Sequence, residues 1–295
     1  MSDVSKKARR DEAREHARDA REIERKRRAR NSLLIKIVVV LVLLAIAAGV
    51  VWFAATTRQA AIDAATPKPG PANMLSDGII LQGDSDGNIV AARTPAIPAE
   101  GDAVPTDPQE YADVVKIVVY LDYLCPFCQK FEAANAEQLA TWVSAGAATL
   151  EIHPIAFLDN ASAGSRYSSR SANAMACVAN FAPDTFFLAN AAMYTSQPPE
   201  GTTGLTNEEL VALLKTAGVN DEKVTRCIDN ESFSQWVTAA TKRTADPVPN
   251  STLEEIAGTP TVLVNGIKYP GDPSDAAAFD AFVTSIAIGT YEPAG

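Results

Sequence analysis

The sequence predicts an α/β domain with a helical insertion, preceded by an N-terminal transmembrane helix. Three observations lead to this class. First, residues 37–57 form an apolar run of 21 residues without a charged side chain. Second, residues 114–157 show a β-branched segment, a helical pattern and a further β-rich segment in succession, which is the order of a β-α-β unit. Third, a long helical stretch, residues 165–245, separates this unit from two short apolar segments at 261–269.

The N-terminal part indicates a membrane anchor. Residues 1–32 contain 12 Lys and Arg and 7 Asp and Glu and form a basic leader. As a helix, the apolar run after it spans about 30 Å, the thickness of a bilayer's hydrocarbon core. We expect a single transmembrane helix within residues 33–57, with the leader in the cytoplasm and the rest of the chain outside, because basic flanks stay inside. A cleaved signal peptide is the alternative, but its apolar core is only about 7–15 residues long.

The part beyond the anchor has a different composition. After Lys36 it holds 13 Lys and Arg against 29 Asp and Glu. Such an acidic surface is unsuited to nucleic acid, so we expect no nucleic-acid partner. Residues 58–77 include the Pro-rich segment 66–71 and are expected to form an extended linker, with the domain at residues 78–295. All four cysteines lie in this domain, where an oxidising compartment lets disulfides persist.

The first half of the domain is expected to supply most of a sheet. Residues 79–81 and 89–92 flank a polar turn and predict a β-hairpin. Residues 114–121 are rich in Val and Ile and predict a buried strand. A helix over 127–145 then leads to a strand over 148–157. A right-handed crossover of this kind places the two long strands parallel in one sheet.

The second half is expected to be mainly helical before the sheet resumes. Thr206 is a helix-capping residue at the start of one of these helices. Asn265-Gly266 favours a tight turn between short strands at 261–264 and 267–269. The helices are predicted at about 168–181, 206–218, 221–228, 232–244 and 274–288.

Cys125 and Cys128 lie at the junction between the predicted strand and helix. Cys125 is expected at the helix N-cap and Pro126 at the first helical position, where a missing N–H costs nothing. The free amides and the positive end of the helix dipole favour a thiolate at Cys125. Cys128 follows about one turn later, close enough to attack a mixed disulfide on Cys125. Such a pair supports thiol–disulfide exchange.

Thr259 and Pro260 mark a second unusual position. A proline at the start of a strand cannot donate to the hydrogen-bond ladder. If the Thr259–Pro260 bond is cis, the Thr259 backbone stays open toward the cysteines, and an extended substrate segment can pair with it. From this motif alone, an ordinary trans bond at the start of a strand remains the alternative.

Taken together, these motifs resemble the DsbA-like branch of the thioredoxin superfamily. The resemblance rests on Cys-Pro-Phe-Cys at 125–128, about a hundred residues of helical pattern, and Gly-Thr-Pro-Thr at 258–261 before a strand and an Asn-Gly hairpin. It covers roughly residues 78–290. It implies a thioredoxin-like fold whose helical insertion, about 160–250, lies between the second and third core strands. It also implies that Cys125 is the exposed nucleophile, Cys128 the buried resolving thiol and Pro260 a cis-proline.

The resemblance further implies an extracytoplasmic thiol–disulfide oxidoreductase that forms disulfide bonds in exported proteins. Its implied partners are unfolded exported proteins with cysteine pairs and a quinone-linked membrane protein that reoxidises it; no cofactor and no metal are needed. Thr259, Phe127 and Pro126 are the expected substrate-binding residues. The alternatives are a membrane-anchored disulfide reductase or isomerase of the same fold, and a non-enzymatic scaffold.

Two residues near the cysteines need separate interpretation. DsbA carries His before its second cysteine, whereas this chain has Phe127, which cannot stabilise the Cys125 thiolate electrostatically; we therefore expect a weaker oxidant. Asp122 lies three residues before Cys125. It is either a proton acceptor for the buried thiol or a strand-end cap or surface acid.

Cys177, Cys227 and His153 remain. The two cysteines lie on predicted helices of the insertion without a neighbour at redox spacing, which favours a structural disulfide between them; two free buried thiols are the alternative. A zinc site with the other two cysteines is disfavoured because the second pair is scattered. A Cys–His hydrolase is disfavoured because His153 lies in the middle of a predicted strand.

Overall fold

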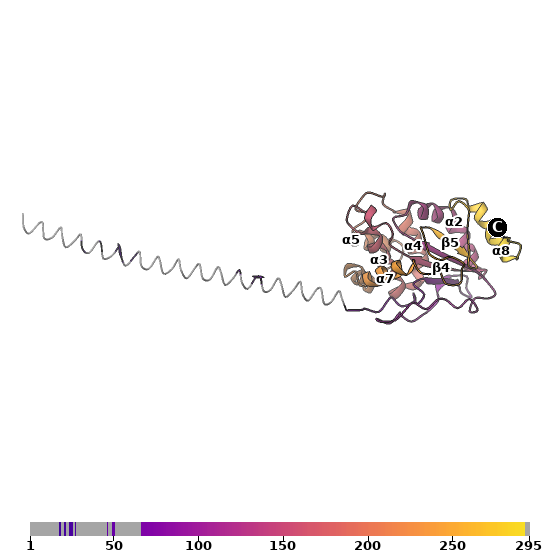
Figure 1. The fold of residues 1–295 in the computed structure, drawn as a ribbon, viewed down its shortest axis with the longest axis horizontal. Helices are drawn as coiled ribbons and strands as arrows, with labels where there is room; N and C mark the ends of the chain where they lie inside the picture. Colours follow the sequence, from indigo (N-terminus) through magenta and orange to yellow (C-terminus); the bar gives the residue numbers. More distant parts are fainter. Residues whose placement is uncertain are drawn as a thin grey trace, which may run out of the picture. The chain divides into compact units, whose positions relative to one another are not determined.

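The structure is a computed structural model that describes residues 66–292 and, ahead of them, single helical residues: Arg18, Arg21, Glu24, Arg25, Arg27, Ile46, Gly49 and Val50. The chain divides into two compact units, 1–66 and 67–295, and the second is the labelled domain of Figure 1. The predicted leader, 1–32, and transmembrane helix, 33–57, lie almost entirely outside the described residues. Within the described part of the chain, no helix is long and apolar enough to cross a membrane.

A mixed six-stranded sheet forms the centre of the domain, in the order β2-β1-β4-β3-β5-β6. β3 and β4 pair in parallel, from Val115 opposite Ala148 to Leu121 opposite Pro154, and the other neighbours are antiparallel. The predicted crossover and both hairpins are thereby confirmed. The strands are β1 (Ile79–Gly83), β2 (Ile89–Ala91), β3 (Val115–Leu121), β4 (Ala148–Pro154), β5 (Thr261–Val264) and β6 (Ile267–Lys268).

The two faces of the sheet are covered differently because side chains alternate along β3. Ile117 and Val119 belong to the main core, which also contains Phe131 of α2 (Pro126–Ser144) and Phe279 of α8 (Ala276–Ala287). Tyr120 belongs to a second cluster with Val248 and Ile256, which lie in the segment before β5. A helix pair thus covers one face, and a loop covers much of the other.

The helical insertion lies between β4 and β5, as predicted. Its centre is α3, in which eleven of fifteen residues are buried because the other insertion helices pack around it. Figure 1 shows α3, α5 and α7 at the opposite end of the domain from α8. The insertion consists of the 3₁₀ turns η1 (Asp159–Ala161) and η2 (Pro183–Thr185) and the helices α3 (Tyr167–Phe181), α4 (Phe186–Thr195), α5 (Asn207–Thr216), α6 (Glu222–Asp229) and α7 (Ser234–Arg243).

Short-range sequence signals set several element ends. The Glu209 N–H donates to the Thr206 hydroxyl (3.2 Å), and the Thr206 N–H donates to the Glu209 carboxylate (2.7 Å), which makes a capping box at α5. Asn265 and Gly266 turn with φ 47° and 79°, a region that favours Asn and Gly. A Cβ atom on Gly266 would lie 2.0 Å from the Asn250 carbonyl oxygen, so only glycine fits there.

The prediction of an extended linker over residues 58–77 is wrong for the last part of that range. The Gly70 N–H donates to the Ile97 carbonyl (2.9 Å), and the Asn73 side chain donates to the Ala179 carbonyl (2.8 Å). Met74 is completely buried. The Pro-rich composition indicates extended chain, but the side chains that follow bind this chain to the insertion. The second compact unit therefore begins at Pro67 rather than at residue 78.

Candidate active site

Cys125 lies where β3 is followed by α2. It is the N-cap residue of α2, with extended dihedral angles of φ −73° and ψ 119°, and Pro126 occupies the first helical turn, as predicted. The Cys125 N–H donates to the Asp122 carbonyl (3.0 Å) and closes the turn between strand and helix. The unpaired amides of the first helical turn therefore lie beside the Cys125 sulfur.

Hydrogen bonds lower the pKa of Cys125 to about 6. The largest effect comes from the Cys128 thiol, and further donors are the Thr259 side chain and the backbone N–H groups of Cys128 and Phe127. Burial opposes this shift, since Cys125 is only 4% exposed. The prediction of an exposed nucleophile is therefore wrong, because the turn that carries Thr259 lies against the sulfur. Because donors stabilise the anion, the thiolate predominates at pH 7.

Cys128 has the opposite electrostatic environment. It is 2% exposed, and its burial, followed by the neighbouring Cys125 sulfur, raises the pKa of Cys128 well above its ordinary value. Both residues are free thiols in this structure. The pair therefore combines a nucleophilic thiolate with a shielded, protonated thiol, which is the division of roles that disulfide exchange needs.

The Thr259–Pro260 peptide bond is cis and directly precedes β5. When protonated, the Cys125 thiol donates to the Thr259 carbonyl oxygen at 3.2 Å. The Thr261 hydroxyl donates to the Gly258 carbonyl (2.7 Å) and closes the turn that carries Thr259. The fold thus brings together two motifs that are 134 residues apart in the sequence.

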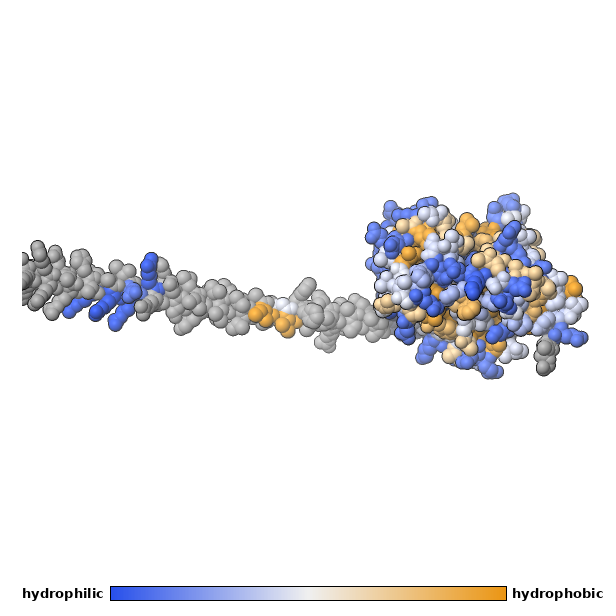
Figure 2. Space-filling model, turned by 90° about the horizontal axis from the view of Figure 1, so that it is seen from above, coloured by the Kyte–Doolittle hydropathy of each residue, from blue (hydrophilic) through white to orange (hydrophobic). Residues whose placement is uncertain are grey.

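Pro126 and Phe127 are both exposed beside the nucleophile. The Phe127 ring is 56% exposed, and the Lys130 ammonium lies 5.2 Å from its centre. Figure 2 shows a surface on which hydrophilic and hydrophobic residues are interspersed. An exposed ring next to the cysteines suits contact with apolar segments of an unfolded chain.

Asp122 is completely buried, which excludes the surface-acid interpretation. Its carboxylate accepts from the Leu124 N–H (2.8 Å), the Leu158 N–H (2.9 Å) and the Ser168 hydroxyl (2.7 Å). Burial raises the pKa of Asp122 to about 6, although these hydrogen bonds oppose the rise. The side chain therefore joins the end of β3 to the start of the insertion and titrates near neutral pH.

The raised pKa of Asp122 predicts a pH-dependent stability. A carboxyl group whose folded pKa exceeds its unfolded value stabilises the fold fully below the unfolded pKa, 3.8, and this contribution is lost as pH rises through about 6. Between pH 7.5 and pH 4.5, wild type should therefore gain about 2 kcal/mol relative to Asp122→Asn, which does not titrate. Urea unfolding of both proteins at the two pH values measures this difference; an unchanged difference would mean that Asp122 titrates normally.

Two polar residues of the insertion bind the active-site backbone, and no sequence motif marks either of them. The Tyr194 hydroxyl donates to the Asp122 carbonyl (3.3 Å). The Gln197 amide donates to the carbonyls of Tyr123 and Cys125, both at 3.0 Å. The Tyr123 carbonyl has no backbone donor among the described residues, so Gln197 supplies its hydrogen bond. The Asp122 and Cys125 carbonyls also accept from the N–H groups of Cys125 and Gln129, and the insertion adds a second bond to each. The insertion therefore positions the nucleophile as well as extending the fold.

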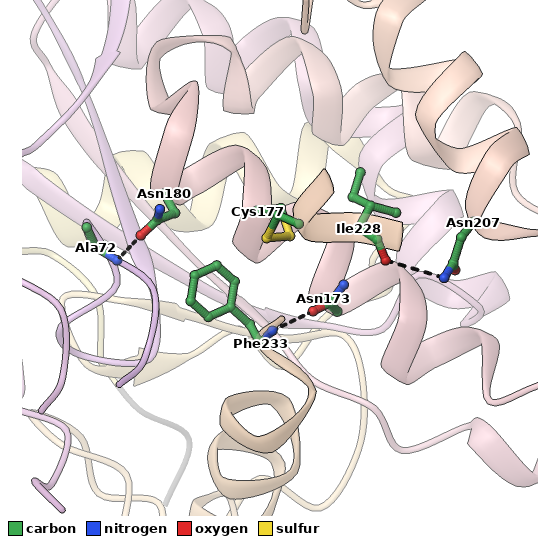
Figure 3. The surroundings of a disulfide bond; sticks show 8 residues. Ala72, Asn173, Cys177, Asn180, Asn207, Ile228 and Phe233 are labelled. Atoms are coloured by element: carbon green, nitrogen blue, oxygen red, sulfur yellow. Dashed lines mark hydrogen bonds between the residues drawn. A yellow bond between two sulfur atoms is a disulfide. The ribbon is translucent and has the colours of Figure 1, made fainter. Parts of the chain in front are cut away.

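Cys177 and Cys227 form a disulfide that joins α3 to α6, with the Cα atoms 5.8 Å apart, which confirms the predicted structural disulfide. Cys177 is completely buried. Figure 3 shows amide side chains around the bond: Asn173 accepts from the Phe233 N–H (2.8 Å), and Asn207 donates to the Ile228 carbonyl (3.3 Å). The bond therefore lies in the interior of the insertion.

His153 is a packed residue of β4. Its Nε2 lies 3.1 Å from the Glu151 carboxylate, and its ring stacks on Tyr120 at 4.3 Å. These are the contacts expected of a strand residue and leave the hydrolase alternative without structural support.

The low pKa of Cys125 predicts the pH dependence of its alkylation. With the reduced protein, the rate of iodoacetamide reaction at Cys125 should rise with pH around a midpoint of about 6, because only the thiolate reacts. In Cys128→Ala the main hydrogen-bond donor is lost, so the midpoint should move upward. Mass spectrometry of the labelled peptide reports both curves, and equal midpoints would contradict the assigned cause.

A strand followed by a cysteine-capped helix, a cis-proline before an antiparallel strand and a helical insertion define a thioredoxin fold of the DsbA type. Comparison with protein families supports this class: residues 110–285 match the model of the thioredoxin family. The chain belongs to the thioredoxin family. No curated protein sequence matches the chain.

Solved structures with a similar fold include DsbA of Mycobacterium tuberculosis in its reduced and oxidised forms. Reduced DsbA of Mycobacterium tuberculosis is 28% identical, with 72% of this chain and 93% of that chain covered and a TM-score of 0.53. The disulfide bond oxidoreductase DsbG of the same organism is 31% identical over 59% and 78%, with a TM-score of 0.49. Oxidised BdbD of Bacillus subtilis is 17% identical over 76% and 99%, with a TM-score of 0.53, and shows similarity of fold alone.

Proposed function

We propose that this protein is an extracytoplasmic thiol–disulfide oxidoreductase that forms disulfide bonds in exported proteins through Cys125 and Cys128. The observation that carries the proposal is the opposite direction of the two cysteine pKa values within one thioredoxin-fold motif. A lowered pKa makes Cys125 a good leaving group in the oxidised pair and a nucleophile in the reduced pair. The contact of Cys125 with Thr259 beside the cis-proline supports the same role.

In the proposed reaction, a substrate thiolate attacks the Cys125 sulfur of the oxidised pair. The Cys125–Cys128 bond breaks, a mixed disulfide forms at Cys125, and Cys128 leaves and takes up a proton because of its high pKa. A second substrate thiolate then attacks the substrate sulfur of the mixed disulfide and releases Cys125 as a thiolate. Two electrons pass from the substrate to the cysteine pair, and the substrate gains one disulfide.

The electrostatics of the reduced state favour this direction. Stabilising the Cys125 thiolate stabilises the reduced protein, which makes its disulfide a better oxidant. A Cys125 pKa of about 6 lies between those of thioredoxin, about 7, and DsbA, about 3.5. This intermediate value agrees with Phe127 in the position where DsbA has a histidine. We therefore propose that the protein is an oxidase of moderate strength.

We further propose that residues 33–57 anchor the enzyme in the cell membrane with the catalytic domain outside. The apolar run and its basic flank support this orientation. The Cys177–Cys227 bond supports an oxidising compartment, since such bonds are rare in reducing ones. Reoxidation of Cys125 and Cys128 then requires an electron acceptor, for which we propose a quinone-linked membrane protein.

Substrate binding is proposed at the rim around Cys125. Phe127 and Pro126 offer an exposed apolar surface, and the Thr259 backbone offers an edge for an extended segment. Binding through backbone groups and one aromatic ring requires little of the amino-acid sequence of the substrate. This arrangement suits many unfolded exported proteins with cysteine pairs rather than a single partner.

The reduction potential of the Cys125–Cys128 pair tests the direction of electron flow. We expect a value between those of thioredoxin, about −270 mV, and DsbA, about −120 mV, and an oxidised pair when the protein is trapped with acid and alkylated in cells. A potential near that of thioredoxin with a reduced pair in cells would instead support the reductase or isomerase. A Cys125 that resists alkylation in the reduced protein would support a scaffold.

A further inference from the structure

A cavity of about 310 Å³ lies against the sheet face that carries Tyr120. It is bounded by β3, β4 and β5 and by two segments, residues 103–111 and 246–256. Its volume falls within the range of about 300–1,000 Å³ that is usual for small-molecule sites. None of the residues proposed to act in exchange at Cys125 lines it. Four prolines with fixed φ angles stiffen its loop walls: Pro105, Pro108, Pro247 and Pro249.

The floor of the cavity combines apolar side chains with one hydroxyl group that has no hydrogen-bond partner in the described part of the protein. Val118, Leu263 and Ile256 line it together with Tyr120. Tyr120 is 8% exposed, and its ring is held by stacking on His153. Among the described residues, no group hydrogen-bonds to the Tyr120 hydroxyl. The hydroxyl of this largely buried residue therefore opens to the cavity and has capacity to donate to a ligand.

The first buried acid on the wall, Glu151, is already fully engaged. Its carboxylate accepts from the Ser76 hydroxyl (2.5 Å), from the Thr106 hydroxyl (3.1 Å) and from His153 Nε2 (3.1 Å). These bonds hold the pKa of Glu151 below its ordinary value although burial opposes them. The Glu151 carboxylate is therefore already paired within the protein and does not need a cationic group of a ligand.

The second acid, Asp77, is occupied in the same way. It accepts from Trp236 Nε1 (3.0 Å) and from Arg243 Nε (2.6 Å) and Nη2 (2.7 Å). The hydrogen-bonding groups that remain available on the cavity wall are donors. Arg243 has a further nitrogen, and the Lys116 ammonium has hydrogens beyond the one bonded to the Tyr111 carbonyl (3.3 Å). A ligand that fits must therefore offer hydrogen-bond acceptors.

The charges around the cavity decide between a neutral and an anionic acceptor. Lys116 and Arg243 are cationic, whereas Asp77, Glu151 and Asp246 are anionic, so the lining has no positive excess. The domain as a whole is also acidic. An anion would lose its hydration in this cavity and gain little electrostatic attraction in return. A neutral carbonyl group can accept a hydrogen bond without the desolvation cost of a charge.

We propose that this cavity binds an uncharged, mainly apolar small molecule that presents a carbonyl oxygen to the Tyr120 hydroxyl. The molecule's apolar body lies against Val118, Leu263 and Ile256. Its carbonyl oxygen accepts a hydrogen bond from the Tyr120 hydroxyl, for which no described residue provides an acceptor. This site is separate from the proposed exchange at Cys125 and does not depend on it.

Photolabelling of the full-length protein with benzophenone tests the site, because this probe is apolar, uncharged and reacts through a carbonyl group. We expect mass spectrometry to find the label on segments 103–111 and 246–256. 2-Acetylnaphthalene should compete, whereas the anion 2-naphthoate should compete at least about tenfold less well. Label confined to other parts of the chain, or equal competition by the two compounds, would overturn the proposal.

Matched variants separate a specific site from general adsorption. Tyr120→Phe should raise the benzophenone concentration for half-maximal labelling about three- to tenfold, the effect of one hydrogen bond. Tyr269→Phe, which removes a hydroxyl near α8, should leave it unchanged. Ala103→Phe should fill the cavity and remove the label while circular dichroism shows an intact fold. If Tyr120→Phe and Tyr269→Phe behave alike, Tyr120 does not bind the probe.

Discussion

Replacing Cys125 by serine is expected to reduce dithiol oxidation to the uncatalysed background. Serine suits the N-cap position of α2 and keeps about the size of the side chain, but its hydroxyl does not ionise near neutral pH and cannot form a disulfide. Cys125 is also the residue whose pKa the site lowers to about 6, so no other described thiol can replace it. Oxidation of a fluorogenic dithiol peptide by the purified, oxidised protein measures the loss.

Cys128→Ser provides the informative companion to this variant. It keeps the Cys125 thiolate, which can attack a disulfide already formed in an exported protein and release one substrate thiolate. It removes the buried thiol that would then attack the Cys125 sulfur and displace the substrate from the mixed disulfide. We expect Cys128→Ser to accumulate disulfide-linked complexes with exported proteins in cells and Cys125→Ser to accumulate none. Full oxidase activity in Cys125→Ser, or equal complex formation by the two variants, would refute the assigned roles.

Removing the disulfide of the insertion is expected to produce the largest loss of stability. Cys177 and Cys227 are 50 residues apart, and a loop of that length restricts the unfolded chain enough to stabilise the fold by about 4 kcal/mol in the chain-entropy model. The double variant Cys177→Ala and Cys227→Ala should therefore lose about that much free energy of unfolding in urea.

The reduced wild-type protein is the control for this comparison. If the bond itself accounts for the effect, wild type unfolded in the presence of dithiothreitol should match the double variant. A double variant within 1 kcal/mol of oxidised wild type would show that packing of α3 and α6 alone holds the insertion together.

Features that depend on neighbouring residues could be predicted from the sequence. Cys125 at the helix cap, Pro126 after it and the Asn265-Gly266 turn each follow from the conformational preferences of one or two residues. The parallel pairing of β3 and β4 follows from the handedness of crossovers. These rules act within short segments, so one sequence contains enough information to apply them.

Features that depend on distant contacts could not be predicted. Ser168 binds Asp122 across 46 residues, and Gln197 binds the Cys125 carbonyl across 72. Serine and glutamine in helical or loop segments normally face solvent, so nothing in their surroundings marks them as partners of the active site. The packing of Met74 was missed for a similar reason, because the prolines before it suggest a spacer regardless of what the chain touches.

The hydrogen bonds from Tyr194 and Gln197 to the active-site backbone also limit how far the protein can be simplified. Trimming residues 160–250 to obtain a minimal redox module would leave the Tyr123 carbonyl without a donor and would remove one of two hydrogen bonds from the Asp122 and Cys125 carbonyls. Cys125 would remain in the chain, but the hydrogen bonds from the insertion that position its backbone would be lost. The insertion and the cysteine motif therefore form a single structural unit.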